Sequence, residues 1–149
     1  MENIEIFDMT LEDYEQIKDV LISDFDDFWT PDILKSEILG ENKKYIVAKQ
    51  NNEIIGFAGI MLLKPEIEIM NIVTKKTKRS QGIGTLLLHK IIEIAKNNDF
   101  ENILLEVNEK NFVAVKMYKN AGFEQAGIRK KYYGSTENAI LMSKKVNNL

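Results

Sequence analysis

The spacing of hydrophobic residues changes several times along the chain between the two-residue period of a strand and the 3.6-residue period of a helix. Residues 66–96 show both: an apolar run at 67–73 predicts a strand, and apolar residues three to four positions apart from 83 to 94 predict a helix. The run at 102–107 is short and apolar, which predicts a buried strand. Further strand-like runs occupy residues 4–9, 44–50, 53–63, 123–128 and 139–146.

Polar residues and glycines mark the ends of the other predicted helices. Thr10 followed by Asp13 predicts a capping box ahead of one helix, whose apolar positions extend to Ile22. Thr30 before Pro31 predicts the start of a short second helix. The remaining boundaries are Gly40 after the second helix, and Asn111 and Gly122 at the two ends of a later one.

The predicted elements follow the order β-α-α-β-β-β-α-β-α-β-β. Asn51-Asn52 between two strand-like runs predicts a tight hairpin turn, and the helix at 83–94 predicts one crossover between strands. We therefore expect the α+β class, with a mixed, mostly antiparallel central sheet covered by helices on both faces. The length of 149 residues, with only 2 prolines, suits a single domain over residues 1–149.

Positive charge and glycine coincide in the loop that precedes the helix at 83–94. Lys75, Lys76, Lys78 and Arg79 are followed by the segment 81–84, which reads Gln-Gly-Ile-Gly. The first N–H groups of a helix lack partners within the helix, and glycine lets an anion approach them closely. The loop is therefore a candidate phosphate-binding turn, and the alternative is a solvated basic loop.

Composition limits the chemistry that the chain can perform. The chain has no cysteine and a single histidine, which excludes thiolate nucleophiles and Cys-ligated zinc and makes a Ser-His triad or a multi-His metal site improbable. Any reaction would use carboxylates, hydroxyls and the backbone, and we expect no metal.

Net charge and hydrophobicity also bear on partners. The formal net charge is −3, which disfavours a general nucleic-acid-binding protein. No apolar run approaches the ~18 residues of a membrane span, and the first ten residues do not resemble a secretion signal. We expect a cytoplasmic protein that binds neither nucleic acid nor membrane.

Several motifs together resemble the GNAT N-acetyltransferase superfamily, and in particular its RimI-like members, the ribosomal-protein alanine N-acetyltransferases. The resemblance covers the chain from about Thr30 onward and is specific from residue 66 to residue 142. It rests on Arg79-Ser80-Gln81-Gly82-Ile83-Gly84, Leu105-Glu106-Val107-Asn108, Asn111, Met117-Tyr118, Ala121-Gly122-Phe123, Arg129-Lys130-Lys131-Tyr132-Tyr133 and Ala139-Ile140-Leu141-Met142. It implies the GNAT acyl-CoA N-acyltransferase fold.

The resemblance also implies acetyl-CoA as co-substrate and suggests which residues hold it. The pantetheine arm would pair with the backbone of Ile72, Val73 and Thr74. Asn111 would contact the CoA arm, and Arg79 would lie near the pyrophosphate. The N–H groups that would receive the pyrophosphate belong to Ser80, Gln81, Gly82, Ile83, Gly84 and Thr85.

The same resemblance implies direct attack of an amine on the thioester, which needs a base and an acid but no covalent intermediate. Glu106 would be the general base, acting through water; the alternative is a solvated glutamate or an ion-pair partner. Tyr118 would be the general acid toward the CoA thiolate; the alternative is a core tyrosine.

The acceptor can be narrowed by proton affinity. An α-amino group titrates near ~8 and a lysine near ~10.4, so neutral lysine costs about 3 kcal/mol more at pH 7. We therefore expect the N-terminal α-amine of a protein, with a ribosomal protein as the family-level partner. A small amine, a lysine side chain and a non-catalytic CoA-binding regulatory module are the alternatives. Candidate acceptor contacts are Trp29, Glu68, Tyr132 and Tyr133, and the loop at 134–138 is shorter than this family leads us to expect.

Overall fold

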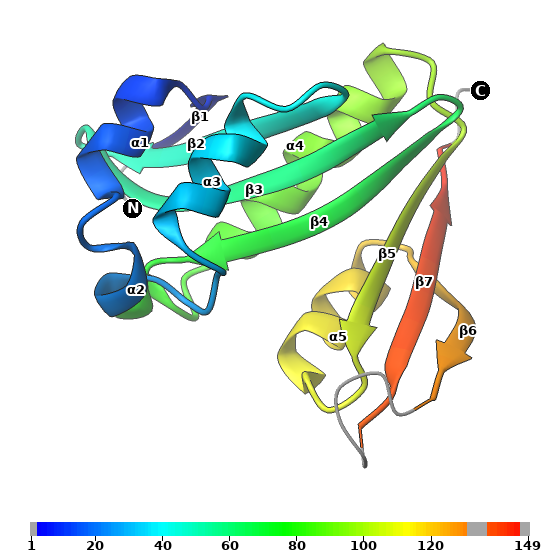
Figure 1. Cartoon of the computed structure of the whole chain (residues 1–149). Helices are drawn as coiled ribbons and strands as arrows, with labels where there is room; N and C mark the ends of the chain where they lie inside the picture. The colour runs from blue at the N-terminus through cyan, green and yellow to red at the C-terminus, as the bar shows by residue number, and fades with distance from the viewer. Residues whose placement is uncertain (1–2, 131–136, 147–149) are drawn as a thin grey trace. The chain divides into compact units, whose positions relative to one another are not determined.

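The computed structural model describes residues 3–130 and 137–146. Within these residues seven strands form one mixed sheet in the order β1-β2-β3-β4-β5-β7-β6, which confirms the expected fold class (Figure 1). β4 and β5 run parallel, whereas β1–β2, β2–β3, β5–β7 and β6–β7 are antiparallel pairs. The elements are β1 (Ile4–Asp8), α1 (Leu11–Ile17), α2 (Leu21–Asp24), α3 (Pro31–Ile38), β2 (Lys43–Gln50), β3 (Glu53–Leu63), β4 (Glu66–Thr74), the 3₁₀-helix η1 (Lys76–Lys78), α4 (Ile83–Asn97), β5 (Asn102–Asn108), α5 (Phe112–Asn120), β6 (Glu124–Arg129) and β7 (Ala139–Lys145).

Contacts between residues divide the chain into two compact units, which are described separately here. The first unit comprises residues 1–62 and 70–91, and the second comprises residues 63–69 and 92–149. The sequence led us to expect one domain over residues 1–149, and this stays a prediction.

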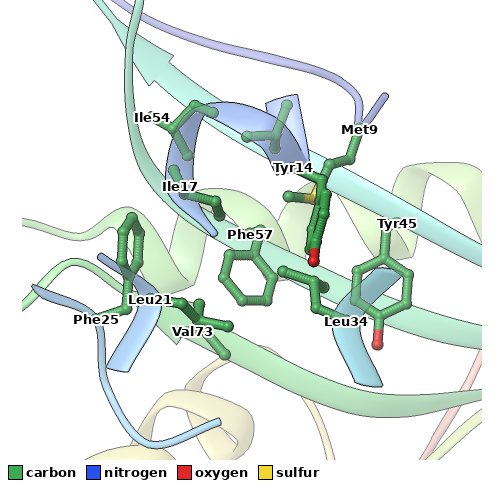
Figure 2. Close-up of a cluster of buried hydrophobic side chains, with 11 residues drawn as sticks. Met9, Tyr14, Ile17, Leu21, Phe25, Leu34, Tyr45, Ile54, Phe57 and Val73 are labelled. Carbon is green, nitrogen blue, oxygen red and sulfur yellow. The ribbon is translucent and has the colours of Figure 1, made fainter. Parts of the chain in front are cut away.

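The core of the first unit lies on both faces of its strands. The middle of β2 and most of β3 are buried at consecutive positions, as expected when helices cover both faces of a strand. Helices α1, α2 and α3 lie on one face and α4 on the other (Figure 1). The side chains packed under α1, α2 and α3 form the cluster in Figure 2: Met9, Tyr14, Ile17, Leu21, Phe25, Leu34, Tyr45, Val47, Ile54, Phe57 and Val73.

The predicted helix from Thr10 to Ile22 is in fact two helices, so this part of the prediction is wrong. α1 ends at Ile17, and Val20 N–H then bonds to Ile17 carbonyl in a turn before α2 begins at Leu21. The turn changes the direction of the chain, so that Leu21 is fully buried while Ile22 is 70% exposed. The sequence did not predict this break, because apolar residues continue at helical spacing on both sides of it.

The start of α1 has the predicted capping box. Thr10 N–H donates to Asp13 Oδ2 at 2.9 Å, and Asp13 N–H donates to Thr10 Oγ1 at 3.1 Å. Lys49 Nζ lies 2.8 Å from Asp13 Oδ1, and the Asp13 side chain is buried. Burial opposes ionisation of Asp13, but the hydrogen bonds from Lys49 and Thr10 outweigh it and hold the pKa of the carboxyl below its usual range.

The second unit is built on β5, β7, β6 and α5. The prediction of a buried strand at 102–107 is confirmed for one face of β5: Ile103, Leu105 and Val107 are buried, while the residues between them are partly exposed. Asn111 caps α5 by accepting a hydrogen bond from Ala114 N–H. Gly122 ends the helix with φ of 96°, a left-handed conformation that suits glycine, so both predicted boundaries are confirmed.

We expect Asp13→Asn to lower the free energy of unfolding at pH 7 by about 1–2 kcal/mol, because Lys49 loses a charged partner. The pKa of Asp13 is depressed in the folded protein, so this stabilisation is present above about pH 4 and is lost as pH falls through the folded pKa. Urea unfolding at pH 7 and at pH 3 checks this. The exposed Asp19→Asn is the control, and an equal loss for Asp13→Asn at both pH values would contradict the ionic explanation.

Candidate active site

The loop between β4 and α4 is exposed at Ser80, Gln81 and Gly82 and leads into the first turn of α4, whose N–H groups have no partner within the helix. Ser80 and Gly82 both adopt left-handed backbone conformations, with φ of 65° and 81°. α4 begins at Ile83, whose side chain is buried, so the first turn of the helix is held against the core. A Cβ built at Gly82 would meet no atom within 4 Å, so a ligand can approach this part of the backbone.

Three of the four positive side chains of this loop, those of Lys75, Lys78 and Arg79, contact acceptors from the same unit. Arg79 Nε lies 2.6 Å from Asp26 Oδ1, and its Nη2 contacts the same oxygen. Lys75 Nζ lies 2.5 Å from the carboxylate of Glu53. Lys78 donates to the Gln50 side chain at 3.3 Å. The loop is thus exposed and also ion-paired at Arg79 and Lys75, and both the phosphate-binding turn and the solvated basic loop stay open.

The last part of β4 carries the predicted pantetheine-binding residues. The parallel register of β4 with β5 ends at Ile69 opposite Leu105, while β4 continues to Thr74. Val73 is buried in the cluster of Figure 2, whereas Ile72 and Thr74 are partly exposed. The side chain of Val73 is therefore not available to a ligand, and Val73 could contact one only through its backbone, as the resemblance implies.

The segment between α2 and α3 places the predicted acceptor residue Trp29 at the surface. Trp29 is 56% exposed, and its ring centroid lies 5.2 Å from that of Phe28. Phe28 in turn meets the buried Phe57 edge-on, with centroids 5.4 Å apart. Thr30 then caps α3 ahead of Pro31, as predicted.

The predicted base Glu106 lies on β5 in the second unit and forms an ion pair. Its Oε1 lies 2.6 Å from Arg129 Nη2, and the Glu106 side chain is 25% exposed. Strand register explains the pairing, because Glu106 lies opposite Leu141 and Arg129 lies opposite Ala139 of the shared neighbour β7. An ion pair was one of the alternatives expected for Glu106, and Arg129 was not predicted as its partner.

The predicted acid Tyr118 lies on α5 in the same unit as Glu106. Its side chain is only 7% exposed, and its ring packs edge-on against Phe123 with centroids 5.6 Å apart. Burial raises the pKa of Tyr118 to about 12, because the phenolate would lose its hydration. Tyr118 is thus both a packed side chain and a hydroxyl that stays protonated at neutral pH.

The turn from β5 to α5 contains Asn108, Glu109 and the predicted CoA contact Asn111. Asn108 Nδ2 donates to Glu137 Oε1 at 3.1 Å, and Asn138 N–H donates to Glu109 Oε2 at 3.0 Å. These bonds tie the start of α5 to the residues just before β7. The side-chain oxygen of Asn111 accepts a hydrogen bond from the N–H of Ala114.

The remaining site predictions fall into two groups. Glu68 lies on β4 opposite Leu104 of β5 and is partly exposed. Tyr132 and Tyr133, like residues 134–136 of the short loop, lie outside the described residues.

The described residues do not bring together three His, Asp or Glu side chains as metal ligands. Nor does this part of the chain include a helix long and apolar enough to cross a membrane.

Comparison with known proteins identifies the family. The profile of the Acetyltransferase (GNAT) family matches residues 5–123, which is most of the chain and includes parts of both units. The chain belongs to the GNAT family. The GNAT resemblance that the sequence motifs indicated is thereby confirmed, and GNAT proteins use acetyl-CoA.

Two relatives show which branch of the GNAT family this chain is similar to. A Bacillus subtilis (strain 168) protein, named provisionally as a ribosomal protein bS18-alanine N-acetyltransferase, is 34% identical over 137 residues, or 90% of each chain. The ribosomal protein bS18-alanine N-acetyltransferase of Haemophilus influenzae is 35% identical over 77% of this chain and 80% of its own.

A solved structure agrees on the fold. The crystal structure of the ribosomal-protein-S18-alanine N-acetyltransferase from Escherichia coli has a TM-score of 0.87, with 24% identity, over 97% of this chain and 95% of that one. The predicted GNAT fold is confirmed by this similarity.

We expect Gly82→Ala to weaken the binding of CoA at least ten-fold, because a Cβ would enter the space beside the loop and strain a left-handed backbone. Isothermal titration calorimetry with CoA measures the affinity. Gly122→Ala is the control for the left-handed backbone, since φ at Gly122 is also positive. Its Cβ would meet the flexible end of Lys144, which can move aside, and the variant should keep its CoA affinity. Equal CoA affinities for the two variants would contradict a diphosphate site at Gly82.

Proposed function

We propose that this protein transfers the acetyl group of acetyl-CoA to the N-terminal α-amine of a protein, as its relatives named for ribosomal protein bS18 do. The observation that carries the proposal is the 34% identity over 90% of both chains to the Bacillus subtilis protein. The predicted base and acid, Glu106 and Tyr118, stand at the positions that match the family motif. A ribosomal acceptor would place the protein in the cytoplasm.

Acetyl-CoA would be held mainly by the first unit. The N–H groups of residues 80–85 would receive the diphosphate, helped by the positive end of the α4 dipole and by Arg79. The backbone of residues 72–74 would pair with the pantetheine amides, much as an added strand pairs with a sheet edge. Asn111 would contact the CoA arm through its amide nitrogen, because its oxygen already caps α5.

Glu106 would accept the proton that the attacking amine loses, through a water molecule. Its carboxylate is partly exposed, so water can reach it, and the ion pair with Arg129 holds it in one place. Arg129 thus serves as a positioning residue for the base. The proton passes from nitrogen to the carboxylate as the new C–N bond forms.

Tyr118 would donate a hydrogen bond to the sulfur as the C–S bond breaks. The pKa of Tyr118 is about 12, so the hydroxyl is protonated throughout the working pH range. A CoA thiol titrates near ~8.5, so full transfer from Tyr118 would cost about 5 kcal/mol, and a strengthening hydrogen bond to the developing thiolate is the cheaper course. The thiolate then takes its proton from water, and Tyr118 keeps its own.

Trp29 is the acceptor contact that we propose in the first unit, while Glu68, Tyr132 and Tyr133 stay predictions from the family resemblance. A protein α-amine is the acceptor that this chemistry favours, because one carboxylate base suits an amine that titrates near ~8 better than a lysine near ~10.4.

A peptide panel tests the acceptor. We expect the purified protein to acetylate peptides with a free N-terminal alanine faster than peptides with other N-termini, and to leave an N-blocked lysine peptide unmodified. Mass spectrometry of the products measures this and locates the acetyl group. Acetylation of the lysine peptide or of small amines alone would contradict the proposed acceptor.

We expect Glu106→Gln to lower kcat by about 10²-fold or more while leaving CoA affinity unchanged, because the base is lost and the diphosphate loop is intact. A steady-state assay of thiol release, with calorimetry for CoA binding, measures both. Glu124→Gln, which changes an exposed glutamate of β6, is the control and should behave as the unmodified protein. If the unmodified protein binds CoA but transfers no acetyl, the chain is a CoA-binding module instead.

A further inference from the structure

Residues 25–29 join α2 to α3 and are attached to the basic loop and to β4 of the first unit at three points. Asp26 N–H donates to the carbonyl of Thr74 at 2.9 Å. Phe25 forms an isolated antiparallel bridge with Lys75. The Asp26 carboxylate pairs with Arg79, with 2.6 Å between Oδ1 and Nε. The segment that carries Trp29 is thereby connected to the residues proposed to hold acetyl-CoA.

Of these three attachments, the ion pair is the one that another anion can replace. The Arg79 side chain is 59% exposed and that of Asp26 32%, and exposed ion pairs contribute little to stability. Both Nε and Nη2 of Arg79 contact the same oxygen of Asp26. A diphosphate carries more negative charge than one carboxylate and accepts hydrogen bonds from this same fork of the guanidinium.

The two ends of the segment differ in burial: the end at Phe25 is buried and the end at Trp29 is exposed. Phe25 is buried among the side chains of Figure 2, with its ring centroid 6.0 Å from that of Phe57. Trp29 lies at the other end, where its ring packs against Phe28 at an interplanar angle of 54° and its side chain is more than half exposed. Loss of the Asp26–Arg79 contact would leave the bond from Asp26 N–H to Thr74 and the packing of Phe28 against Phe57 in place. It would free only the Asp26 carboxylate and the exposed end at Trp29.

We propose that Asp26 is a positioning residue that couples diphosphate binding to the acceptor-contacting segment at Trp29, an inference that rests on the proposed function. Arg79 exchanges the Asp26 carboxylate for the diphosphate of CoA, and the freed carboxylate lets the exposed end at Trp29 adopt the arrangement that receives the acceptor. Coupling of binding free energies is reciprocal, so an acceptor bound at Trp29 also tightens CoA binding.

Trp29 is the only tryptophan of the chain, so its fluorescence reports on this segment. We expect CoA to change the Trp29 emission of the unmodified protein, and pantetheine, which lacks the diphosphate, to leave it unchanged at concentrations that saturate binding. A structural role for Asp26 alone would produce no difference between the two ligands.

Asp26→Asn removes the competing carboxylate. We expect it to tighten CoA binding roughly three- to five-fold in calorimetry, because an exposed ion pair no longer has to be broken. Its Trp29 emission without ligand should already resemble that of the CoA-bound unmodified protein. Asp27→Asn is the matched control, since it removes the same charge from the adjacent exposed residue and should change neither quantity.

A double-mutant cycle with Arg79→Ala assigns the effect to this pair. In the Arg79→Ala background CoA binds more weakly, and adding Asp26→Asn should cause no further change in affinity. Asp26→Ala provides a second variant with the same expectation, and circular dichroism confirms that each variant is folded.

The inference is overturned if Asp26→Asn and Asp26→Ala bind CoA as the unmodified protein does or more weakly, or if CoA leaves Trp29 emission unchanged. These measurements use no acceptor and no turnover. A failure of the proposed function would instead appear as a lack of acetyl transfer by the unmodified protein, so the two failures are distinguishable.

Discussion

Main-chain groups that leave a sheet or begin a helix still need hydrogen-bond partners, and in this protein that requirement shapes residues 70–85. The register of β4 with β5 ends at Ile69, yet β4 continues to Thr74. Thr74 carbonyl then accepts from Asp26 N–H, a residue far away in the sequence. The first turn of α4 follows soon after, with N–H groups that the helix itself cannot satisfy. A co-substrate rich in amides and phosphate oxygens complements such a backbone.

The loop keeps these groups exposed because its neighbours are fixed. Ile83 and Leu87 of α4 are buried, and a Cβ at Gly56 of β3 would lie 2.9 Å from Ile83 Cγ2, so helix and strand pack in close contact. Left-handed conformations at Ser80 and Gly82 then turn the chain between η1 and the helix. Rigidity on the core side and open space beside Gly82 on the other side are what an anion site needs, because the donors require no rearrangement.

The sequence predicts those features of the structure that depend on residues close together in the chain, and it misses those that depend on tertiary contacts. Caps and turns at Thr10, Thr30, Asn111 and Gly122 were predicted correctly, since each depends on residues three or four positions away. The mixed sheet followed from the order of elements. The break between α1 and α2 was missed, because Leu21 is turned toward the core by packing that no spacing rule contains. The partners of Arg79 and Glu106 were missed as well, since they depend on tertiary contacts and strand register across 53 and 23 residues.

The ion pairs of Arg79 with Asp26 and of Glu106 with Arg129 have the same physical effect on the side chains that they join. Arg79 and Glu106 carry opposite charges, stand in different units, and each pairs with a residue of opposite charge from its own unit. An isolated exposed cation or carboxylate would sample many rotamers, whereas a pair restricts each side chain at little cost because both remain partly hydrated. Holding the side chain in one place has a different consequence for Arg79 than for Glu106. In the proposed function Arg79 would exchange its carboxylate partner for a diphosphate, so Asp26 would compete with the ligand. Glu106 would only receive a proton through water, so Arg129 could stay in contact and hold it. The same kind of interaction would then oppose binding at one residue and position a base at the other, and the charge of the incoming group would decide which.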